Sequence, residues 1–171
     1  MRTWEDALRL LDAGADRVSI GSAAVQAPDV LTAIAERAGR AAVILSVDAR
    51  HVTADRCVAT RRGGREDTTV DAMDLARAGA AAGAGEILLN VIDADGTREG
   101  FDVAYTRRVA QAVPVSVIAS GGAGTPAHFH AVLTEGRAGV ALDAGISHDG
   151  SCRVGDVKRY LQAHGVEVRP C

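Results

Sequence analysis

Aromatic side chains are scarce in this chain, at 3% of 171 residues, although 47% of the residues are hydrophobic. A core with so few aromatics must consist of Ala, Val, Leu and Ile, the usual filling of α/β proteins. The length is sufficient for one domain with a core of this kind. We therefore expect a single α/β domain over residues 1–171.

The sequence also lacks an excess of basic residues and a long apolar run. The net charge is -3 and no basic stripe is visible, so nucleic acid is not an expected partner. The longest apolar run, "AAVILSV" at 41–47, is far shorter than the roughly 20 residues that span a bilayer. The opening "MRTWEDALRL" contains acids and no continuous apolar stretch, so neither a signal peptide nor a membrane association is expected.

Cysteine is present only as three scattered residues, Cys57, Cys152 and Cys171. An odd, scattered set predicts neither a disulfide framework nor a metal motif, and it is typical of the reducing cytoplasm. The five histidines show no ligand spacing. No metal and no cofactor are therefore expected.

The pattern that is present alternates between Val- and Ile-rich apolar runs and Ala-rich segments with helical spacing. The expected strands are 17–20, 42–47, 86–91, 115–120 and 139–142. The expected helices are 4–13, 28–38, 71–82, 103–112, 126–135 and 154–164, with a longer loop and a small hairpin at 56–64 after the second strand. This alternation predicts parallel strands under a coat of helices.

The chain also repeats itself. The segment "LDAGADRVSIGSA" at 11–23 resembles "LTEGRAGVALDAG" at 133–145. The matches at an offset of 122 positions are Thr3 with Thr125, Gly14 with Gly136, and Val18 with Val140. A period this long indicates duplicated half-domains rather than a solenoid.

The two copies are unequal, because "VSVIASGG" precedes Thr125 and nothing comparable precedes Thr3. About five strands are expected here, whereas a β/α barrel has eight strands in roughly 250 residues. We therefore expect an incomplete (β/α)8 TIM barrel that lacks its first three βα units. The alternative is a small, complete open sheet.

Polar residues and glycines follow the expected strands. They are Asp48; Asp93 and Asp95; Ser120, Gly121 and Gly122; Asp143, Ala144 and Gly145; and Gly21 and Ser22. In β/α barrels the active site lies at the carboxyl ends of the strands, so these residues are expected to share one rim.

Each of these residues has a functional and a structural interpretation. Glycine allows backbone N–H groups to approach a phosphate, and the two glycine loops 120–122 and 143–145 would be neighbours in a barrel. Gly121 and Gly122 could instead merely form a turn. Asp48 is placed as a general acid or base, or else as a loop cap or an ion-pair partner of Arg50. Asp95, in "DADGT", could be part of a plain Asp-Gly turn.

Five motifs carry a specific resemblance: "VSIGSAAV", "LSVDARHV", "GAGEILLNVIDADGTREGFD", "VIASGGAGTPAHF" and "LQAHGVEVR". Together they resemble the cyclase subunit of imidazole glycerol phosphate synthase, of histidine biosynthesis. The resemblance covers essentially the whole chain and implies a two-fold symmetric β/α barrel. Family members begin with three further strands, in agreement with the gap found in the repeat.

The resemblance implies a reaction in which ammonia attacks a ribonucleotide with a phosphate at each end. Asp48 then matches one of two proton-transferring carboxylates; the other belongs to a first strand that this chain does not contain, so we expect the chain alone to be inactive. The implied substrate contacts are Asn90, Asp95, Gly21, Ser22, Ser120, Gly121, Gly122, Ala144 and Gly145. Asp143 stands where the family usually has a small apolar residue, and its charge would weaken a phosphate site.

The resemblance also implies a partner, a glutamine amidotransferase subunit that supplies ammonia through the barrel in a heterodimer. Asp16, Arg17 and Glu86 match the residues that face this partner and gate the ammonia entrance; by themselves they would be plain surface charges. Two alternatives remain. One is the sister isomerase of the same pathway, which needs no amidotransferase, and the other is a non-catalytic fragment.

Overall fold

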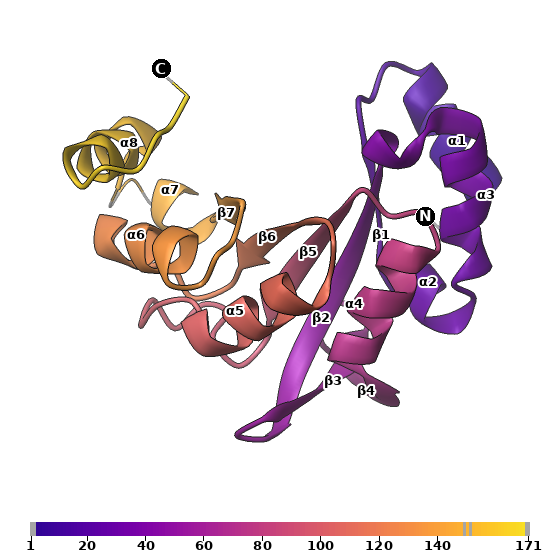
Figure 1. The fold of residues 1–171 in the computed structure, drawn as a ribbon, viewed down its shortest axis with the longest axis horizontal. Coiled ribbons are helices and arrows are strands. Elements are labelled where there is room, and N and C mark those ends of the chain that lie inside the picture. The colour runs from indigo at the N-terminus through magenta and orange to yellow at the C-terminus, as the bar shows by residue number, and fades with distance from the viewer. Residues whose placement is uncertain (1–2, 149, 151, 170–171) are drawn as a thin grey trace.

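The computed structural model describes residues 3–148, 150 and 152–169, which form one curved, seven-stranded sheet with helices on its outside (Figure 1). The strands are β1 (Val18–Ile20), β2 (Val43–Thr53), β3 (Arg56–Arg61), β4 (Glu66–Asp71), β5 (Glu86–Val91), β6 (Ser116–Ser120) and β7 (Val140–Leu142). Five of them, in the order β1-β2-β5-β6-β7, are parallel. The expected α/β class with a parallel sheet is therefore confirmed.

Among the described residues, six helices lie close to the expected positions and two short ones were not expected. They are α1 (Trp4–Asp12), α2 (Ser22–Gln26), α3 (Asp29–Ala38), α4 (Ala72–Ala81), α5 (Val103–Ala112), α6 (Pro126–Thr134), α7 (Gly145–His148) and α8 (Val154–Ala163), with a 3-10 turn, η1 (Arg40–Ala42). Capping explains why several begin where they do. The Thr3 side chain accepts a hydrogen bond from the Asp6 N–H, and the Asp71 and Asp102 carboxylates do the same for the first turns of α4 and α5.

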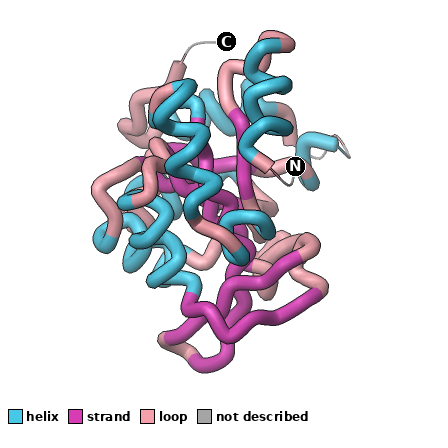
Figure 2. Tube along the Cα trace, turned by 90° about the vertical axis from the view of Figure 1, so that its right-hand side faces the viewer, coloured by secondary structure: helices cyan, strands magenta, loops and turns pink. Residues whose placement is uncertain are grey.

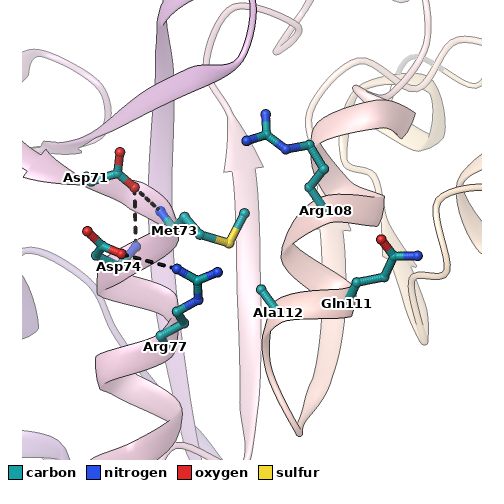
Figure 3. A pocket seen from close by; sticks show the side chains of 7 residues that line it. All are labelled: Asp71, Met73, Asp74, Arg77, Arg108, Gln111 and Ala112. Carbon is teal, nitrogen blue, oxygen red and sulfur yellow. Dashed lines mark hydrogen bonds and ion pairs between the residues drawn. The ribbon is translucent and has the colours of Figure 1, made fainter.

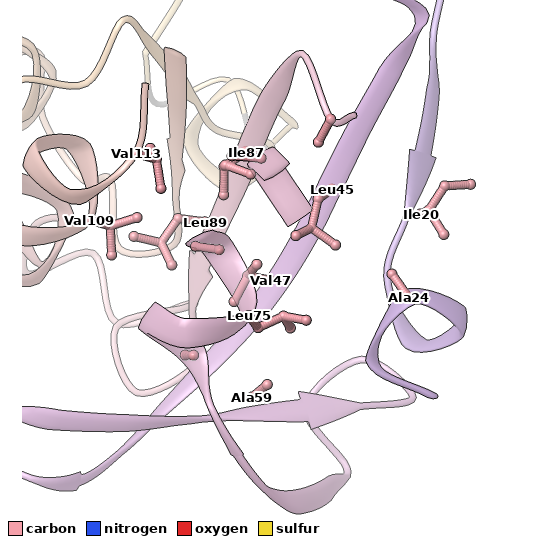
Figure 4. Packing of buried hydrophobic residues seen from close by; sticks show 14 of the residues in the cluster. Ile20, Ala24, Leu45, Val47, Ala59, Leu75, Ile87, Leu89, Val109 and Val113 are labelled. Carbon is pink, nitrogen blue, oxygen red and sulfur yellow. The ribbon is translucent and has the colours of Figure 1, made fainter. Parts of the chain in front are cut away.

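The sheet buries one face under these helices. In β2 as far as Ala49, and throughout β5, every second residue is buried and the residues between are partly exposed. The buried set includes Leu45, Val47 and Ile87, which contact side chains of α3, α4 and α5 such as Leu75 and Val109 (Figure 4). The opposite, concave face carries the polar side chains, so the alternation of the strands separates the core from the candidate site.

The segment after β2 differs from the expected loop and small hairpin. Strand β2 does not stop at residue 47 but continues to Thr53, and it pairs antiparallel with β3, which in turn pairs with β4. These strands form the projecting sheet extension at the lower end of Figure 2. Asp48 therefore lies within a strand rather than in a loop after it, because β3 and β5 continue to satisfy the backbone of β2 beyond that point.

The internal repeat is present, and strands β1 and β7 begin 122 positions apart, as the expected match requires. Helices α1 and α6 begin 122 positions apart, whereas α2 and α7 begin 123 positions apart. The left-handed residues that follow the first helix of each unit, Gly14 (φ 103°) and Arg137 (φ 56°), are also 123 apart. One additional residue therefore lies between α6 and Arg137, and the match of Gly14 with Gly136 is wrong. Val18 and Val140 each begin their strand, as expected, but their side chains face opposite sides of the sheet.

The second unit has its own small core between α6 and α8. It includes Phe101 and Phe129, whose rings meet edge-on at 5.4 Å between centroids, together with Val157 and Leu161. Within the described part of the chain, no helix combines the length and the apolar character needed to cross a membrane.

Candidate functional site

A cavity of about 310 Å³ opens at the carboxyl ends of β5, β6 and β7. Its lining consists of Asn90, Asp95, Gly96, Arg98, Ser120, Gly121, Gly122, Ala123, Leu142, Asp143, Ala144 and Gly145. Seven of the nine substrate contacts expected from the sequence are among them. The rule that parallel α/β proteins collect functional residues at this end of the sheet thus located the cavity correctly.

Asp48 borders this cavity through Asn90. The two residues are register partners on β2 and β5, and the Asn90 Nδ2 donates a hydrogen bond of 3.3 Å to the Asp48 Oδ1. Because a carboxylate only accepts, the amide nitrogen of Asn90 must face Asp48 and its oxygen must face away. That buried oxygen, Asn90 Oδ1, has no hydrogen-bond partner among the described residues and lies beside Gly121. Asn90 therefore orients the Asp48 carboxylate and keeps one acceptor unsatisfied at the cavity.

Gly121 and Gly122 are required by close backbone packing. Both have left-handed φ values, 90° and 102°. A Cβ on Gly122 would lie 2.1 Å from the Gly100 carbonyl oxygen, and one on Gly121 would lie 2.8 Å from the Val91 oxygen. The loop after β6 is thus pressed against the loop after β5, and the Gly100 N–H donates to the Gly122 oxygen at 2.8 Å. The structural interpretation of these glycines is correct, and their role toward phosphate stays a prediction.

The charges around the cavity are mixed. Asp95 and Asp143 bring two carboxylates and Arg98 one guanidinium to its lining. The Asp143 Oδ2 accepts a hydrogen bond of 3.0 Å from the Ile146 N–H, in the first turn of α7. A backbone donor that could face an anion is therefore already engaged by a carboxylate of the chain itself.

Gly21 and Ser22 lie at the carboxyl end of β1, outside this cavity. The Ser22 Oγ accepts a hydrogen bond of 3.1 Å from the Arg62 N–H, in the turn between β3 and β4. Gly21 lies next to Ser46, since a Cβ there would be 3.6 Å from the Ser46 Cβ. The structure thus separates the two expected phosphate loops across the concave face.

The opposite rim carries the residues expected to face a partner. Arg17, just before β1, forms an ion pair with Glu86, the first residue of β5, so the pair bridges the start of β2. Asp16 is exposed next to Arg17. Two of the three expected residues are therefore in direct contact.

A second crevice, of about 480 Å³, lies between α4 and α5 on the outside of the sheet (Figure 3). It is lined by Asp71, Met73, Asp74, Arg77, Arg108, Gln111 and Ala112. Asp71 caps α4, and Asp74 pairs with Arg77. These charges serve the helices, and none of the residues expected at the active site is among them.

Sequence reasoning missed a cluster around His51. The ring Nε2 lies 2.6 Å from the Asp102 Oδ2 and the ring Nδ1 lies 3.0 Å from the Thr53 carbonyl oxygen. The hydrogen bond to Asp102 raises the pKa of His51 above its ordinary value of 6.5. Burial raises the pKa of the neighbouring Cys57 thiol to about 12, and it also raises the pKa of the Tyr105 hydroxyl. The one available sequence signal was Asp102, placed immediately before a helix.

No group of three or more His, Cys, Asp or Glu side chains is arranged to hold a metal ion within residues 3–148, 150 and 152–169. The site as described consists of carboxylates, an amide and glycine backbone at the ends of parallel strands. This arrangement defines an α/β protein of successive βα units, the class to which the barrel enzymes belong.

Comparison with known proteins identifies the family. The family described as "Histidine biosynthesis protein" matches residues 1–153, and the chain belongs to it. The chain is 52% identical over 169 residues to the imidazole glycerol phosphate synthase subunit HisF of Myxococcus xanthus (strain DK1622). The aligned region is 99% of this chain and 66% of that relative, so the chain spans just under two thirds of the relative's length.

Proposed function

We propose that this chain carries part of the cyclase site of imidazole glycerol phosphate synthase. In that reaction ammonia attacks phosphoribulosyl-formimino-aminoimidazole-carboxamide ribonucleotide. The products are imidazole glycerol phosphate and aminoimidazole carboxamide ribonucleotide. The name of the Myxococcus relative favours this reaction over that of the sister isomerase.

The proposal assigns proton transfer to Asp48. Its carboxylate is half-buried on the concave face and is oriented by the Asn90 amide, as a general acid or base must be held. Asp95 contacts the substrate from the loop after β5. One phosphate lies against Ser120, Gly121 and Gly122, next to Ala144 and Gly145, and the other near Gly21 and Ser22.

The proposal also covers the architecture and the partner. The parallel strands β1, β2, β5, β6 and β7 are five of the eight strands of a β/α barrel, which their chain order and curvature support. A glutamine amidotransferase subunit docks at the rim of Asp16, Arg17 and Glu86 and supplies the ammonia. The cytoplasmic location stays a prediction.

The observation that carries the proposal is the contact of Asn90 with Asp48 at the edge of a cavity lined by glycine loops. An oriented carboxylate beside a cavity with backbone N–H groups fits a phosphorylated substrate that needs proton transfer. Asp48 is also the residue that the sequence predicts to be catalytic.

The test compares Asp48→Asn with Asp12→Asn, an exposed aspartate at the end of α1. Binding of imidazole glycerol phosphate is measured by calorimetry, and turnover is measured with ammonium salt by loss of substrate absorbance. We expect ligand binding in all three proteins. Because the chain alone is expected to be inactive, turnover is compared with the missing upstream strands restored in front of each protein, and it should fall by at least about 100-fold in Asp48→Asn and stay unchanged in Asp12→Asn. Failure of the unmodified chain to bind either substrate or product would contradict the proposal.

A further inference from the structure

The loop that carries Asp95 is held at both of its ends by one residue on a neighbouring strand. This loop, residues 92–102, joins β5 to α5. At its start, the Asp93 Oδ2 accepts a hydrogen bond of 2.8 Å from the backbone N–H of His51. At its end, the Asp102 Oδ2 lies 2.6 Å from the Nε2 of the His51 ring.

We propose that His51 is a positioning residue that fixes the base of the 92–102 loop and thereby places Asp95 at the rim of the cavity. The proposal rests on the proposed function only in taking Asp95 to be a substrate contact. The position of His51 follows from the unexpected extension of β2, because a strand ending at residue 47 would not reach the start of α5.

The contacts of the ring require it to be a cation. Nδ1 faces the Thr53 carbonyl oxygen at 3.0 Å, and Nε2 faces the Asp102 carboxylate. Both neighbours only accept hydrogen bonds, so both ring nitrogens must donate, and only the imidazolium form does so. A neutral ring keeps one of the two contacts and loses the other.

Two backbone hydrogen bonds keep the loop attached to the sheet whatever the state of the ring. The Ile92 N–H donates to the Ala49 oxygen at 2.9 Å, and the Gly100 N–H donates to the Gly122 oxygen at 2.8 Å. The other oxygen of Asp102 caps α5 by accepting from the Tyr105 N–H at 2.9 Å. Asp102 thus links the ring to the helix, and loss of the ring contact loosens the loop without unfolding the sheet.

Several charged or titratable groups surround the ring. Asp93 and Asp102 face it from the loop, Tyr105 meets it edge-on from α5 at 5.7 Å between centroids, and Cys57 is its partner on β3. Arg108 of α5 lies over the Tyr105 ring. The two nearest carboxylates favour the cation and outweigh the effect of burial, in agreement with the raised pKa of His51.

The raised pKa of His51 determines how the stability of its contact with Asp102 changes with pH. Because the pKa is higher in the folded state, the His51 contact is fully formed below pH 6.5 and is lost as the pH rises through the folded-state pKa. The 92–102 loop should therefore be held most firmly at acidic to neutral pH. The cysteine and tyrosine nearby titrate well above this window, since the pKa of each is raised.

The experiment measures amide hydrogen exchange of residues 92–102 at about pH 6 and pH 9, corrected for intrinsic exchange, with NMR titration of the His51 ring alongside. His51→Gln removes the cation. His51→Arg keeps a permanent cation with donors for both acceptors. His164→Gln is the matched control, because His164 is an exposed histidine immediately after the distant helix α8, with its ring facing the Tyr160 carbonyl.

In the unmodified chain, exchange of the loop should rise about tenfold between the two pH values. In His51→Gln the exchange of the loop should be fast at both pH values, and in His51→Arg it should be slow at both. In His164→Gln it should change with pH as it does in the unmodified chain. The proposal would be overturned if the loop of His51→Arg still exchanged faster at the higher pH. It would also be overturned if His51→Gln left the exchange rates of the loop unchanged. No substrate enters this measurement, so failure to bind imidazole glycerol phosphate would refute the proposed function and leave this result standing.

Discussion

The two repeat units of the chain bury their strands in opposite ways. Each unit has a helix, a three-residue strand and a short helix, namely α1-β1-α2 and α6-β7-α7, and both strands lie at an end of the parallel part of the sheet. In β1, Val18 and Ile20 are 3% and 1% exposed. In β7, Val140 and Leu142 are each 43% exposed.

The additional residue after α6 explains the difference. Val18 is paired with the fully buried Val43, on the face covered by helices, whereas Val140 is paired with Ile118, on the concave face. A shift of one residue in a strand transfers its side chains to the other face. The comparison teaches that the two units are similar in their sequence of elements but not in which side chains their strands contribute to the core.

The largest expected effect separates the two strands directly. Ile20→Ala should lower the free energy of unfolding by about 3 kcal/mol, because a fully buried side chain is removed and a cavity remains. Leu142→Ala should lower it by less than about 1 kcal/mol, since that side chain is already half in solvent. Urea unfolding of both variants measures the difference, and equal losses would refute the assignment of faces.

The glycines of the second unit give the next largest effect. Gly122→Ala should lower the free energy of unfolding by about 2 kcal/mol, because its left-handed φ and the Gly100 oxygen both oppose a Cβ. Gly145→Ala should change it by less than about 0.5 kcal/mol, since the corresponding residue of the first unit, Ser22, already has a side chain. Thermal unfolding of the pair tests this, and a large loss for Gly145→Ala would contradict the one-residue offset.

The second unit carries a negative charge, that of Asp143, at its strand-end loop. Asp143→Ala removes a carboxylate from the cavity and releases the Ile146 N–H. Binding of inorganic phosphate at the loop after β7 should therefore become about tenfold tighter. This is the effect expected when the repulsion between one nearby carboxylate and the phosphate is removed in water. Calorimetric titration measures the change, with Asp12→Asn as the control. Weaker phosphate binding would mean that Asp143 supports the loop more than its charge opposes the ligand.

The smallest effect concerns the left-handed residues that end the helices. Gly14→Ala should lower the free energy of unfolding by roughly 1 kcal/mol, because a side chain is strained at φ 103° although the space is open. Arg137→Gly should raise it by no more than about 0.5 kcal/mol, since relief at φ 56° is offset by the entropy of glycine. Urea unfolding measures both changes in the free energy of unfolding, and changes of opposite sign would support the equivalence of Gly14 and Arg137.

Much of the fold was predictable because its signals are local. Thr3, Asp71 and Asp102 stand immediately before helices, and the apolar runs mark the five parallel strands. The extension of β2 was not predictable in this way, since "DARHVTADRCV" is polar and resembles a loop until β3 pairs with it. Helices α2 and α7 are too short, at five and four residues, to show a helical period.

The residues of the candidate site also divide into those with a local sequence signal and those without one. The rim residues Asp95 and Ser120 follow from a rule about strand ends, and the structure brings them into one cavity. His51 and Asp102 are 51 positions apart, and nothing local in the sequence connects them. Their contact depends on where the extended β2 passes α5, which is a property of the tertiary structure.

The burial of Cys57 has a practical consequence. A thiol with a pKa of about 12 is protonated at neutral pH and does not react with alkylating reagents while the structure is closed around it. Cys57 pairs with His51, is fully buried and interacts with Tyr105 of α5, so it becomes accessible only when this part of the molecule opens. With the other two cysteines replaced by serine, the rate of its alkylation would report how often the sheet extension separates from α5 in the unlabelled native protein.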